Sequence, residues 1–349
     1  MREKRPMKNG ILAAVLVALT GTVSTADDLS AVKVETGKWQ AAIDAASAGG
    51  GGTVTIPEGR HVTGGLFLRD NVTLKLEKGA VLEGVPDGSR YAQVDLEFVE
   101  TRSPWSALIM ATNAVNVAVV GEGRLFGNGG AFPPSWESVG RPRGLIFYRC
   151  RNVRLEDVTI HDMGSWTCYF KECDGVTARR VTIDSHVNRN NDGFDIDSRN
   201  VLIEDCTVDG SDDGICLKSD NPSFTVENVT VRNCTVASSC NALKIGTGSH
   251  GNFRNILFEN VRTRLCSRFG HNAAGYDREK ALEGCRRRFK GCSSPYSSIS
   301  AIAIENVDGG KLENVTSAIS KPRGRECRFS SAPDSAPAAV AAFPPEPAA

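Results

Sequence analysis

Two short acidic segments of this 349-residue chain carry the residue types that acid and base chemistry requires. The first contains Asp192, and the second contains the adjacent pair Asp212 and Asp213, which ends 21 positions after Asp192. Such carboxyl groups can hydrolyse a bond together, because one protonates the leaving group while another activates a water molecule. Carboxylates held close together repel one another, so we expect at least one of the three to have a raised pKa.

Other polar residues near these segments are candidates for binding a substrate. They are Asn190, Lys218, Asn241 and Lys244. An amide can hydrogen-bond a sugar or a carboxylate, and a lysine can face a sugar carboxylate, although a lone lysine on a strand is as often simply solvated. Asp195 and Asp197 are expected to be structural, one orienting a neighbour and the other facing solvent. The plain alternative for the Asp–Asp–Gly segment is an ordinary turn.

A repeat places these candidates relative to one another. From about residue 150, short strands that begin with Asn–Val and continue into Val–Thr–Ile or Cys–Thr–Val recur along the chain. Their second apolar positions, separated by 23, 25, 28, 27 and 54 residues, are Val158, Val181, Cys206, Cys234, Val261 and Val315. The last spacing is twice 27, which suggests one obscured copy. Strands repeating at this length predict a solenoid, in which equivalent strands stack about 4.8 Å apart.

We therefore predict an all-β fold, a right-handed parallel β-helix. A β-sandwich is disfavoured because hairpin turns are sparse, and βαβ units are disfavoured because no helical pattern separates the strands. Asparagines at the corners are expected to stack in ladders, and four cysteines are expected to be small core residues: Cys150, Cys173, Cys206 and Cys234. A short helix capped by Thr36, with Trp39, Ile43 and Ala46 on one side, is expected to cover the N-terminal end.

In such a solenoid Asp192, Asp213 and Asn241 fall on one face of neighbouring coils, since 21 and 28 residues separate them. The predicted domains are a signal peptide over 1–26 and a β-helix catalytic domain over 27–318, followed by a disordered Pro/Ala-rich tail over 319–349. Residues 264–297 lack the repeat, either as a surface insertion or as the product of an altered reading frame.

The overall charge does not point to nucleic acid or to a membrane as a partner. The 41 basic and 41 acidic residues cancel, which gives no electrostatic reason to expect nucleic acid or an anionic membrane. We expect a secreted or periplasmic monomer. No metal-ligand spacing or nucleotide loop stands out, so we expect no cofactor and no metal.

The two acidic segments resemble glycoside hydrolase family 28, the polygalacturonase group. Asn190–Asn191–Asp192 resembles that family's Asn–Thr–Asp motif with Asn191 in place of Thr, and Asp212–Asp213 with Lys218–Ser219 resembles its paired-aspartate motif. Further segments resemble the family in order and spacing: Trp39–Ile43, Gly51–Val54, Pro57–Gly59, Gly64–Leu66, Leu76–Ala80 and Arg141–Pro142. The resemblance covers roughly residues 36–263 and 300–315.

This resemblance implies a parallel β-helix that hydrolyses a glycosidic bond of pectin-type polysaccharide with inversion. It implies that Asp212 protonates the leaving oxygen and that Asp192 and Asp213 activate the water. Inverting enzymes leave about 6.5–9.5 Å between acid and base, which positions one coil apart could supply. The chain departs from the family in two places. Asn241 replaces the histidine of a Gly–His–Gly motif, and no Arg–Ile–Lys occurs in the stretch of about thirty residues after it, where the family's Arg–x–Lys motif should fall.

Two alternatives remain open at this stage. One is a polysaccharide lyase on the same fold, which would use a cation such as calcium held by aspartates. The other is a catalytically inactive solenoid that only binds glycans, which the irregular segment and the departures from the family motifs keep open. Sensitivity to a chelator separates the first from a hydrolase, and retained polysaccharide binding without any product identifies the second.

Overall fold

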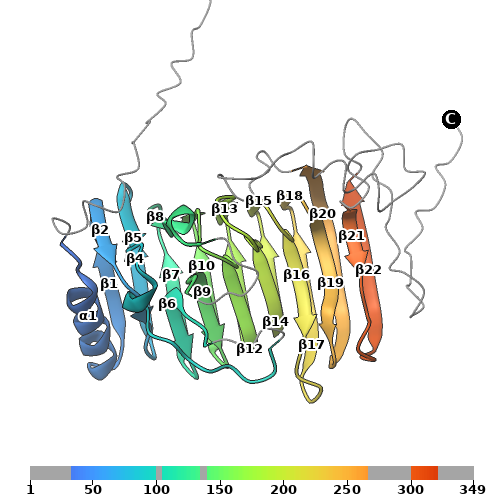
Figure 1. Cartoon of the computed structure of the whole chain (residues 1–349). Helices are drawn as coiled ribbons and strands as arrows, with labels where there is room; N and C mark the ends of the chain where they lie inside the picture. Colours follow the sequence, from blue (N-terminus) through green and yellow to red (C-terminus); the bar gives the residue numbers. More distant parts are fainter. Residues whose placement is uncertain (1–32, 100–103, 134–139, 266–299, 321–349) are drawn as a thin grey trace, which may run out of the picture. The chain divides into compact units, whose positions relative to one another are not determined.

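The computed structural model describes residues 33–99, 104–133, 140–265 and 300–320. In this part of the chain each strand pairs in parallel with the equivalent strand of the next coil (Figure 1). Within these ranges, the one antiparallel pairing is an isolated bridge between Val94 and Trp105. The strands form three long ladders, which we call the first, second and third sheets. The predicted parallel β-helix is confirmed.

The first sheet contains β3 (Leu66–Phe67), β6 (Ala107–Thr112), β9 (Arg143–Tyr148), the start of β12 (Cys168–Arg179), the start of β14 (Phe194–Glu204), β16 (Ile215–Ser219), β19 (Asn241–Ser249) and β21 (Ser300–Ile304). The second contains β1 (Gly52–Ile56), β4 (Val72–Leu76), β7 (Val115–Val120), β10 (Arg151–Glu156), the ends of β12 and β14, β17 (Thr225–Arg232), β20 (Asn252–Leu265) and β22 (Leu312–Ser320). The third contains β2 (Gly59–Thr63), β5 (Ala80–Gly84), β8 (Arg124–Phe126), β11 (Thr159–His161), β13 (Thr182–Ser185), β15 (Thr207–Gly210), β18 (Thr235–Ser238) and the end of β20.

The core consists of stacked rows of inward-facing side chains, because alternate residues of a strand point to opposite faces. One such row in the first sheet is almost fully buried and runs through Ile109, Leu145, Cys168, Phe194, Ile215, Leu243 and Ile302. Phe147 and Phe170 stack in the neighbouring row with ring centroids 5.5 Å apart. The four cysteines predicted to be core residues are buried free thiols.

Asparagine ladders mark one corner of the coils, as predicted. Asn255 donates to Asn228 at 3.0 Å, and Asn228 donates to Asn200 at 2.9 Å. These three residues have φ between 55° and 57°, in the left-handed region that asparagine tolerates better than most residues. The same positions therefore fix the corner geometry and link adjacent coils.

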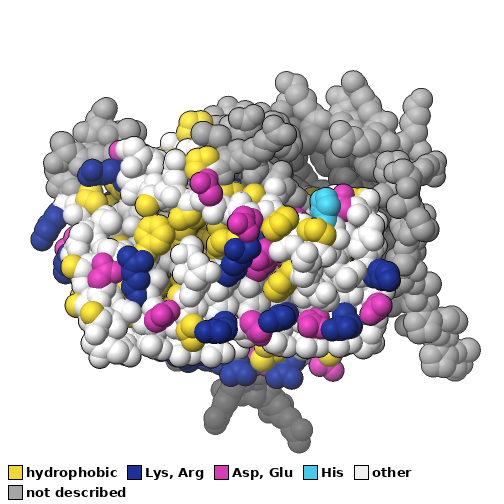
Figure 2. Space-filling view, turned by 90° about the horizontal axis from the view of Figure 1, so that it is seen from below, with side chains coloured by type: hydrophobic (Ala, Val, Ile, Leu, Met, Phe, Trp, Pro, Cys, Tyr) yellow, Lys and Arg dark blue, Asp and Glu magenta, His cyan; other side chains and the backbone are white. Residues whose placement is uncertain are grey.

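Ion pairs also join neighbouring coils on the outside of the solenoid. Arg199 pairs with Asp174 at 2.9 Å, and Arg232 pairs with Glu204 at 2.6 Å. Figure 2 shows basic and acidic side chains alternating along one edge of the viewed face. Pairs this exposed contribute little to stability individually.

The N-terminal helix α1 (Thr36–Ala48) differs from its prediction at its first residue. The capping position is Glu35, which makes no side-chain capping bond, so the prediction that Thr36 caps the helix is wrong. The Thr36 hydroxyl instead accepts a hydrogen bond from the backbone of Gly64 at 2.7 Å, which ties the helix to the first coils. Trp39 and Ile43 are buried as predicted, while Ala46 is only partly buried.

The register of the last strand corrects the repeat alignment. Val315 of β22 pairs with Ile256, and Ile319 pairs with Val261, so Val315 occupies the first apolar position of its repeat rather than the second. Because β20 and β22 pair directly, no obscured coil lies between Val261 and Val315.

The predicted boundaries differ slightly from the strand ends. Strand β20 continues to Leu265 and β22 continues to Ser320, each about two residues into the segments predicted to be irregular or disordered. The predicted signal peptide, most of the 264–297 segment and the tail beyond 320 lie outside the described residues. No helix in the described ranges has the length and apolar character needed to cross a bilayer.

Candidate active site

Three consecutive coils bring the candidate residues together where the chain enters the first sheet. Backbone N–H groups donate from Thr167 to Asp192, from Gly193 to Asp213 and from Gly214 to Asn241, at 2.8–3.0 Å. Each candidate therefore stacks on its equivalent in the next coil, as the 21- and 28-residue spacings predicted. The row continues back to Trp166, because Gly144 donates to the Trp166 carbonyl at 3.0 Å.

The glycine after each aspartate is required by the close approach of the coils. A Cβ atom on Gly193 would lie 2.3 Å from the Gly214 carbonyl oxygen, and one on Gly214 would lie 2.6 Å from that of Ala242. Both distances are well inside van der Waals contact. The Asp–Gly pairs are therefore more than turn signals, since they hold the carboxylates of neighbouring coils in register.

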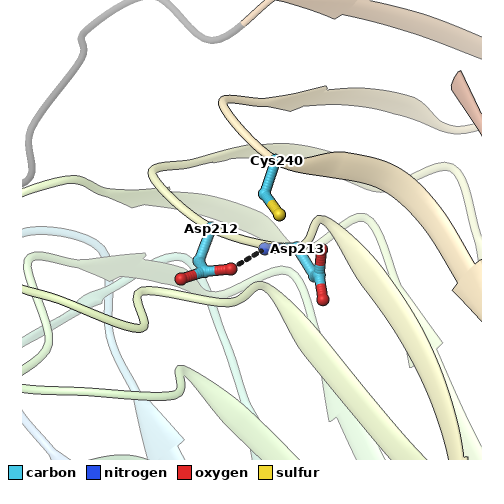
Figure 3. Close-up of side chains that lie close together, drawn as sticks. All are labelled: Asp212, Asp213 and Cys240. Atoms are coloured by element: carbon cyan, nitrogen blue, oxygen red, sulfur yellow. Dashed lines mark hydrogen bonds between the residues drawn. The ribbon is translucent and has the colours of Figure 1, made fainter. Parts of the chain in front are cut away.

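Asp212 and Asp213 form the centre of the site (Figure 3). The Asp212 carboxylate accepts a hydrogen bond from the backbone N–H of Asp213 at 3.0 Å. One oxygen of each carboxylate and the sulfur of Cys240 all lie within 4.8 Å of one another. Sequence analysis did not single out Cys240, because its closeness to the aspartates depends on how the two coils stack.

The environment separates the proton affinities of these two aspartates. Burial, together with the charge of Asp213, raises the pKa of Asp212 to about 6. Burial also acts on Asp213, but the positive charges of Lys244 and Lys218 and a hydrogen bond from Asn241 outweigh it, so the pKa of Asp213 lies below its ordinary value. Below about pH 6 Asp212 holds a proton, and the lowered pKa of Asp213 keeps that carboxyl ionised over more of this range, as expected of an acid and a base.

The contacts of Asp213 explain its lowered pKa. The Asn241 side-chain amide donates to Asp213 Oδ1 at 2.8 Å, and the Asn241 backbone N–H donates to the same oxygen at 3.1 Å. Lys244 Nζ lies 3.1 Å from Asp213 Oδ2 and 3.3 Å from Glu305 Oε2. Lys244 is 9% exposed, so it is not a solvated surface lysine, which was the plain alternative. Its amine stands beside the carboxylate that it keeps ionised.

Asp192 has a different environment from its neighbours. It is 4% exposed, and burial together with the charges of Asp195, Asp212 and Asp213 raises its pKa well above the ordinary value. Its Oδ1 has no hydrogen-bond partner among the described residues. In the substrate-free protein Asp192 therefore holds a proton more firmly than Asp213 does.

The turn that carries Asp192 is fixed by buried polar side chains. Arg141, which is fully buried, donates to the carbonyl oxygens of Gly164 and Arg189 at 3.0 and 2.6 Å and to Asn190 Oδ1 at 3.2 Å. Asn190 thus already has a partner within the protein. Asn191, which replaces the family's threonine, is also buried and donates to the Met163 carbonyl at 2.8 Å.

Lys218 lies on β16 beside the carboxylates. It is 3% exposed, its Nζ is 3.8 Å from Asp195 Oδ1, and it sits over the ring of Trp166 at 4.9 Å from the centroid. Lys218 and Lys244 thus supply two positive charges at the site. Asp195 is fully buried and faces Lys218, in keeping with the structural role expected of it.

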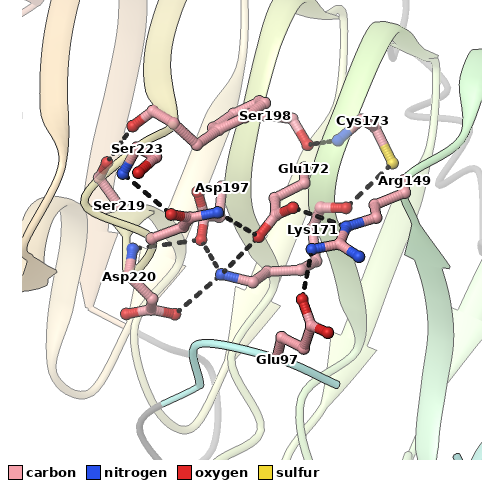
Figure 4. A network of polar contacts seen from close by, with 12 residues as sticks. Glu97, Arg149, Lys171, Glu172, Cys173, Asp197, Ser198, Ser219, Asp220 and Ser223 are labelled. Atoms are coloured by element: carbon pink, nitrogen blue, oxygen red, sulfur yellow. Dashed lines mark hydrogen bonds and ion pairs between the residues drawn. The ribbon is translucent and has the colours of Figure 1, made fainter. Parts of the chain in front are cut away.

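A buried ion network adjoins the site on the next row of the first sheet (Figure 4). Lys171 Nζ lies 2.5 Å from Asp197 Oδ2 and 3.7 Å from Asp220 Oδ2, and neither Lys171 nor Asp197 is exposed. Burial raises the pKa of Asp197 to about 7, against the opposing charge of Lys171. The expectation that one of Asp195 and Asp197 faces solvent is wrong, because both side chains are fully buried.

The donor set argues against a hard cation at the centre of the site. Asp212, Asp213 and Cys240 are the described residues whose ligand atoms lie close enough to share an ion. Burial raises the pKa of the Cys240 thiol, and a neutral thiol is a poor ligand for calcium, which takes oxygen donors. Lys244 also occupies one side of Asp213. These residues do not fit the calcium site that a lyase would need.

Comparison with known proteins supports the resemblance seen in the motifs. Residues 88–224 match the model of Glycosyl hydrolases family 28, a span that includes all three candidate aspartates. A probable polygalacturonase of Arabidopsis thaliana is 30% identical over 183 residues, 44% of this chain and 40% of that protein. An endo-polygalacturonase of Pectobacterium carotovorum is 26% identical over 190 residues, 49% of this chain and 47% of that protein. The chain thus spans less than half the length of these two relatives.

A solved structure that is similar to this chain is also a polygalacturonase. A hyperthermoactive exopolygalacturonase from Thermotoga maritima is 25% identical, with a TM-score of 0.54 over 66% of this chain and 65% of that one. The resemblance to glycoside hydrolase family 28 is confirmed.

Proposed function

We propose that this relative of the family 28 glycosyl hydrolases hydrolyses O-glycosidic bonds in galacturonate-containing, pectin-type polysaccharides. The observation that carries the proposal is the geometry of two adjacent aspartates. Lys244 Nζ and the Asn241 amide contact Asp213 at 3.1 and 2.8 Å and lower its pKa, while burial raises the pKa of Asp212 to about 6. A site that keeps one carboxyl protonated and its neighbour ionised has the acid and the base that glycoside hydrolysis requires.

Asp212 is the acid that protonates the leaving oxygen, and Asp213 is the base that accepts a proton from the attacking water. Asp192 is the second candidate base by resemblance, but its raised pKa favours Asp213 in the substrate-free protein. Its role is then to bind the water or sugar through the oxygen that accepts no hydrogen bond from the described residues.

The proposal includes inversion of the configuration at the anomeric carbon. The distance between the two carboxylates bears on this part of the proposal. Asp212 and Asp213 have carboxylate oxygens within 4.8 Å, closer than the roughly 6.5–9.5 Å usual for inverting pairs. A water could instead be held between Asp213 and Asp192 on the neighbouring coil. Proton NMR of the first-formed product distinguishes the outcomes, since inversion gives the opposite anomer to the substrate linkage and retention gives the same anomer.

The two lysines support an acidic substrate. Lys218 and Lys244 lie beside the catalytic carboxylates, and an ammonium group attracts the carboxylate of a uronate sugar. Asn241 acts on the reaction through Asp213, to which its amide donates. Asn190 lies at the turn before Asp192. Its Oδ1 accepts a hydrogen bond from Arg141, so its side-chain NH2 group is the part of the amide that contacts substrate.

The test is release of reducing ends from polygalacturonate and rhamnogalacturonan, with and without chelator. We expect activity that survives the chelator and falls by roughly 10²–10⁴-fold in Asp212→Asn. Asp157→Asn is the matched control, because it removes an aspartate from an exposed pair with Arg180 on the outside of the solenoid. An unsaturated, ultraviolet-absorbing product would contradict hydrolysis, and folded protein that binds polymer without cleaving it would contradict catalysis.

The pH profile provides a second test of the assignment. Asp212 must be protonated, so activity should fall as the pH rises through about 6. Asp213 must be ionised, and its pKa is below the ordinary 3.8, so the acidic limb should lie at low pH. A profile that rises through neutral pH would contradict Asp212 as the acid.

The proposed site of action is outside the cytoplasm, with the protein as a monomer. This rests on the predicted signal over residues 1–26. Amino-terminal sequencing of the exported protein tests it, with cleavage expected just before Asp27.

A further inference from the structure

The last described coil of the first sheet contributes a charged side chain to the candidate site. Strand β21 pairs in parallel with β19, which places Ala303 opposite Lys244. Two residues after Ala303, the backbone N–H of Glu305 donates to the Ile245 carbonyl at 2.7 Å. The Glu305 carboxylate reaches Lys244 from this position, with Oε2 3.3 Å from Nζ. Glu305 therefore extends the site by one coil beyond β19.

Lys244 lies between two carboxylates that come from different coils. Its Nζ is 3.1 Å from Asp213 Oδ2 and 3.3 Å from Glu305 Oε2, and its side chain is 11% exposed. The charge of Lys218 and the Cys216 thiol also act on it. Two negative charges thus already face one ammonium group. A further carboxylate at Lys244 would be the third, and like charges held this close repel one another.

The two carboxylates beside Lys244 are held with unequal strength. The Asp213 side chain is 6% exposed, and its Oδ1 accepts hydrogen bonds of 2.8 and 3.1 Å from the side chain and backbone of Asn241. The Glu305 side chain is 31% exposed, and among the described residues Lys244 is the ionic partner of its carboxylate. Glu305 is therefore the carboxylate that can leave Lys244 at the smaller cost, because it gives up one partner and gains water.

A galacturonate sugar at this coil brings its own carboxylate toward Lys244. That carboxylate gains the ammonium group only by displacing Glu305, and the repulsion from Glu305 opposes its approach. A methyl-esterified galacturonate carries no charge, so it neither pairs with Lys244 nor meets this repulsion. The position of Glu305 therefore affects the binding of a free uronate and leaves the binding of its ester almost unaffected.

We propose that Glu305 is a specificity-determining residue that competes with a substrate carboxylate for Lys244 and lowers the affinity for free galacturonate relative to its methyl ester. The inference rests on the proposed function and adds a residue that sets the preference between charged and neutral sugars. Glu305 acts through Lys244 and takes no part in proton transfer. It lies outside residues 88–224, which match the family model, and it follows the segment without the repeat.

The experiment compares the kinetics of wild type and Glu305→Gln on polygalacturonate and on its highly methyl-esterified form, each at its optimal pH. We expect Glu305→Gln to lower KM for the unesterified polymer roughly three- to tenfold, with kcat and the KM for the ester nearly unchanged. Glu305→Asp keeps the charge and should stay closer to wild type. Glu156→Gln is the matched control, since it removes a glutamate that pairs with Arg154 at 3.2 Å on the second sheet. An unchanged ratio of the two KM values in Glu305→Gln would overturn the inference and leave the hydrolase proposal intact.

A binding measurement separates this inference from catalysis. Calorimetric titration of the Asp212→Asn protein, with and without Glu305→Gln, uses trigalacturonate and its methyl ester as probes. The double variant should bind the free acid more tightly by the same factor and the ester equally well. Equal changes for both sugars, or no change for either, would overturn the inference. Folded wild-type protein that binds trigalacturonate but cleaves neither polymer would instead overturn the proposed function.

The pH profile supplies a readout that a purely structural role of Glu305 would not move. The charge of Lys244 lowers the pKa of both Asp212 and Asp213, and the negative charge of Glu305 offsets part of it. Glu305→Gln should therefore move both limbs of the activity profile to lower pH, which is the direction opposite to that expected on removing Lys244. A shift of both limbs to higher pH would overturn the assignment of Glu305 to Lys244.

Discussion

The N-terminal and C-terminal coils of the first sheet have the same kind of inner face, but their outer faces carry different types of side chain. Inward rows of Ile, Leu, Phe and Cys continue through both halves without interruption. Outward, β6, β9 and β12 carry aromatic and apolar side chains, while β14, β16 and β19 carry Asp195, Lys218 and Lys244.

This difference shows that, in one β-helix, the inward side chains stabilise the fold and the outward side chains supply the chemistry. The inward rows set the fold in every coil, so the outward rows are free to differ. In the N-terminal half the outward row adds a second buried cluster, and in the C-terminal half it places buried carboxylates beside lysines. Substitutions in the two halves should therefore have different consequences.

The largest effect is expected in the charged half, at the proposed base. Asp213→Asn should lower kcat by roughly 10²–10⁴-fold with little change in KM, because it removes a group used in the transition state. The charge of Asp213 also raises the pKa of Asp212, so the alkaline limb of any residual activity should move to lower pH. Steady-state kinetics across pH measures both effects. A proportional rise in KM alone would assign Asp213 to binding.

The next largest effect is expected at the border of the two halves. Lys171→Met should lower the free energy of unfolding by about 3–5 kcal/mol, because it leaves buried Asp197 without its cation. The pKa of Asp197 is about 7, so the loss should be smaller at pH 5, where this carboxyl can take up a proton. Urea denaturation at pH 5 and pH 8 measures the difference. Equal losses at both pH values would contradict the assignment of the ionised pair.

A smaller effect of opposite sign is expected at the proposed acid. The pKa of Asp212 is raised to about 6, so its ionisation destabilises the folded protein, and this cost appears as the pH rises from about 3.8 through 6. Asp212→Asn should therefore increase the free energy of unfolding at pH 7 by about 1–3 kcal/mol, with no gain below pH 4. Thermal unfolding at both pH values tests this. A variant less stable than the wild type at pH 7 would contradict it.

The smallest effect is a displacement of the pH profile. The charge of Lys244 lowers the pKa of both Asp212 and Asp213, so Lys244→Met should move both limbs of the activity profile to higher pH. Lys75→Met, an exposed lysine of β4 remote from the first sheet, is the control. A Lys244→Met enzyme whose KM rises while its pH profile stays fixed would assign the lysine to substrate binding alone.

Much of the fold followed from local pattern. Period-two alternation, a repeat of about 25 residues and asparagines recurring at the start of the repeats can be seen in the sequence, and together they predicted the solenoid. The shared face of Asp192, Asp213 and Asn241 followed for the same reason, because residues one coil apart must stack. The errors at Thr36 and Val315 arose where a choice between neighbouring residues depended on contacts with other coils.

The sequence by itself therefore determined the β-helix, the row of carboxylates and the residue types available for acid and base chemistry. Only the tertiary structure decided which carboxyl holds a proton, because that depends on burial and on the distances to Lys244, Lys218 and Asn241. It also decided that Arg143, Trp105 and Trp166 stand together, since they lie on separate coils and no short motif joins them. Charge interactions and aromatic packing act through space, and a linear pattern carries no record of distances between coils.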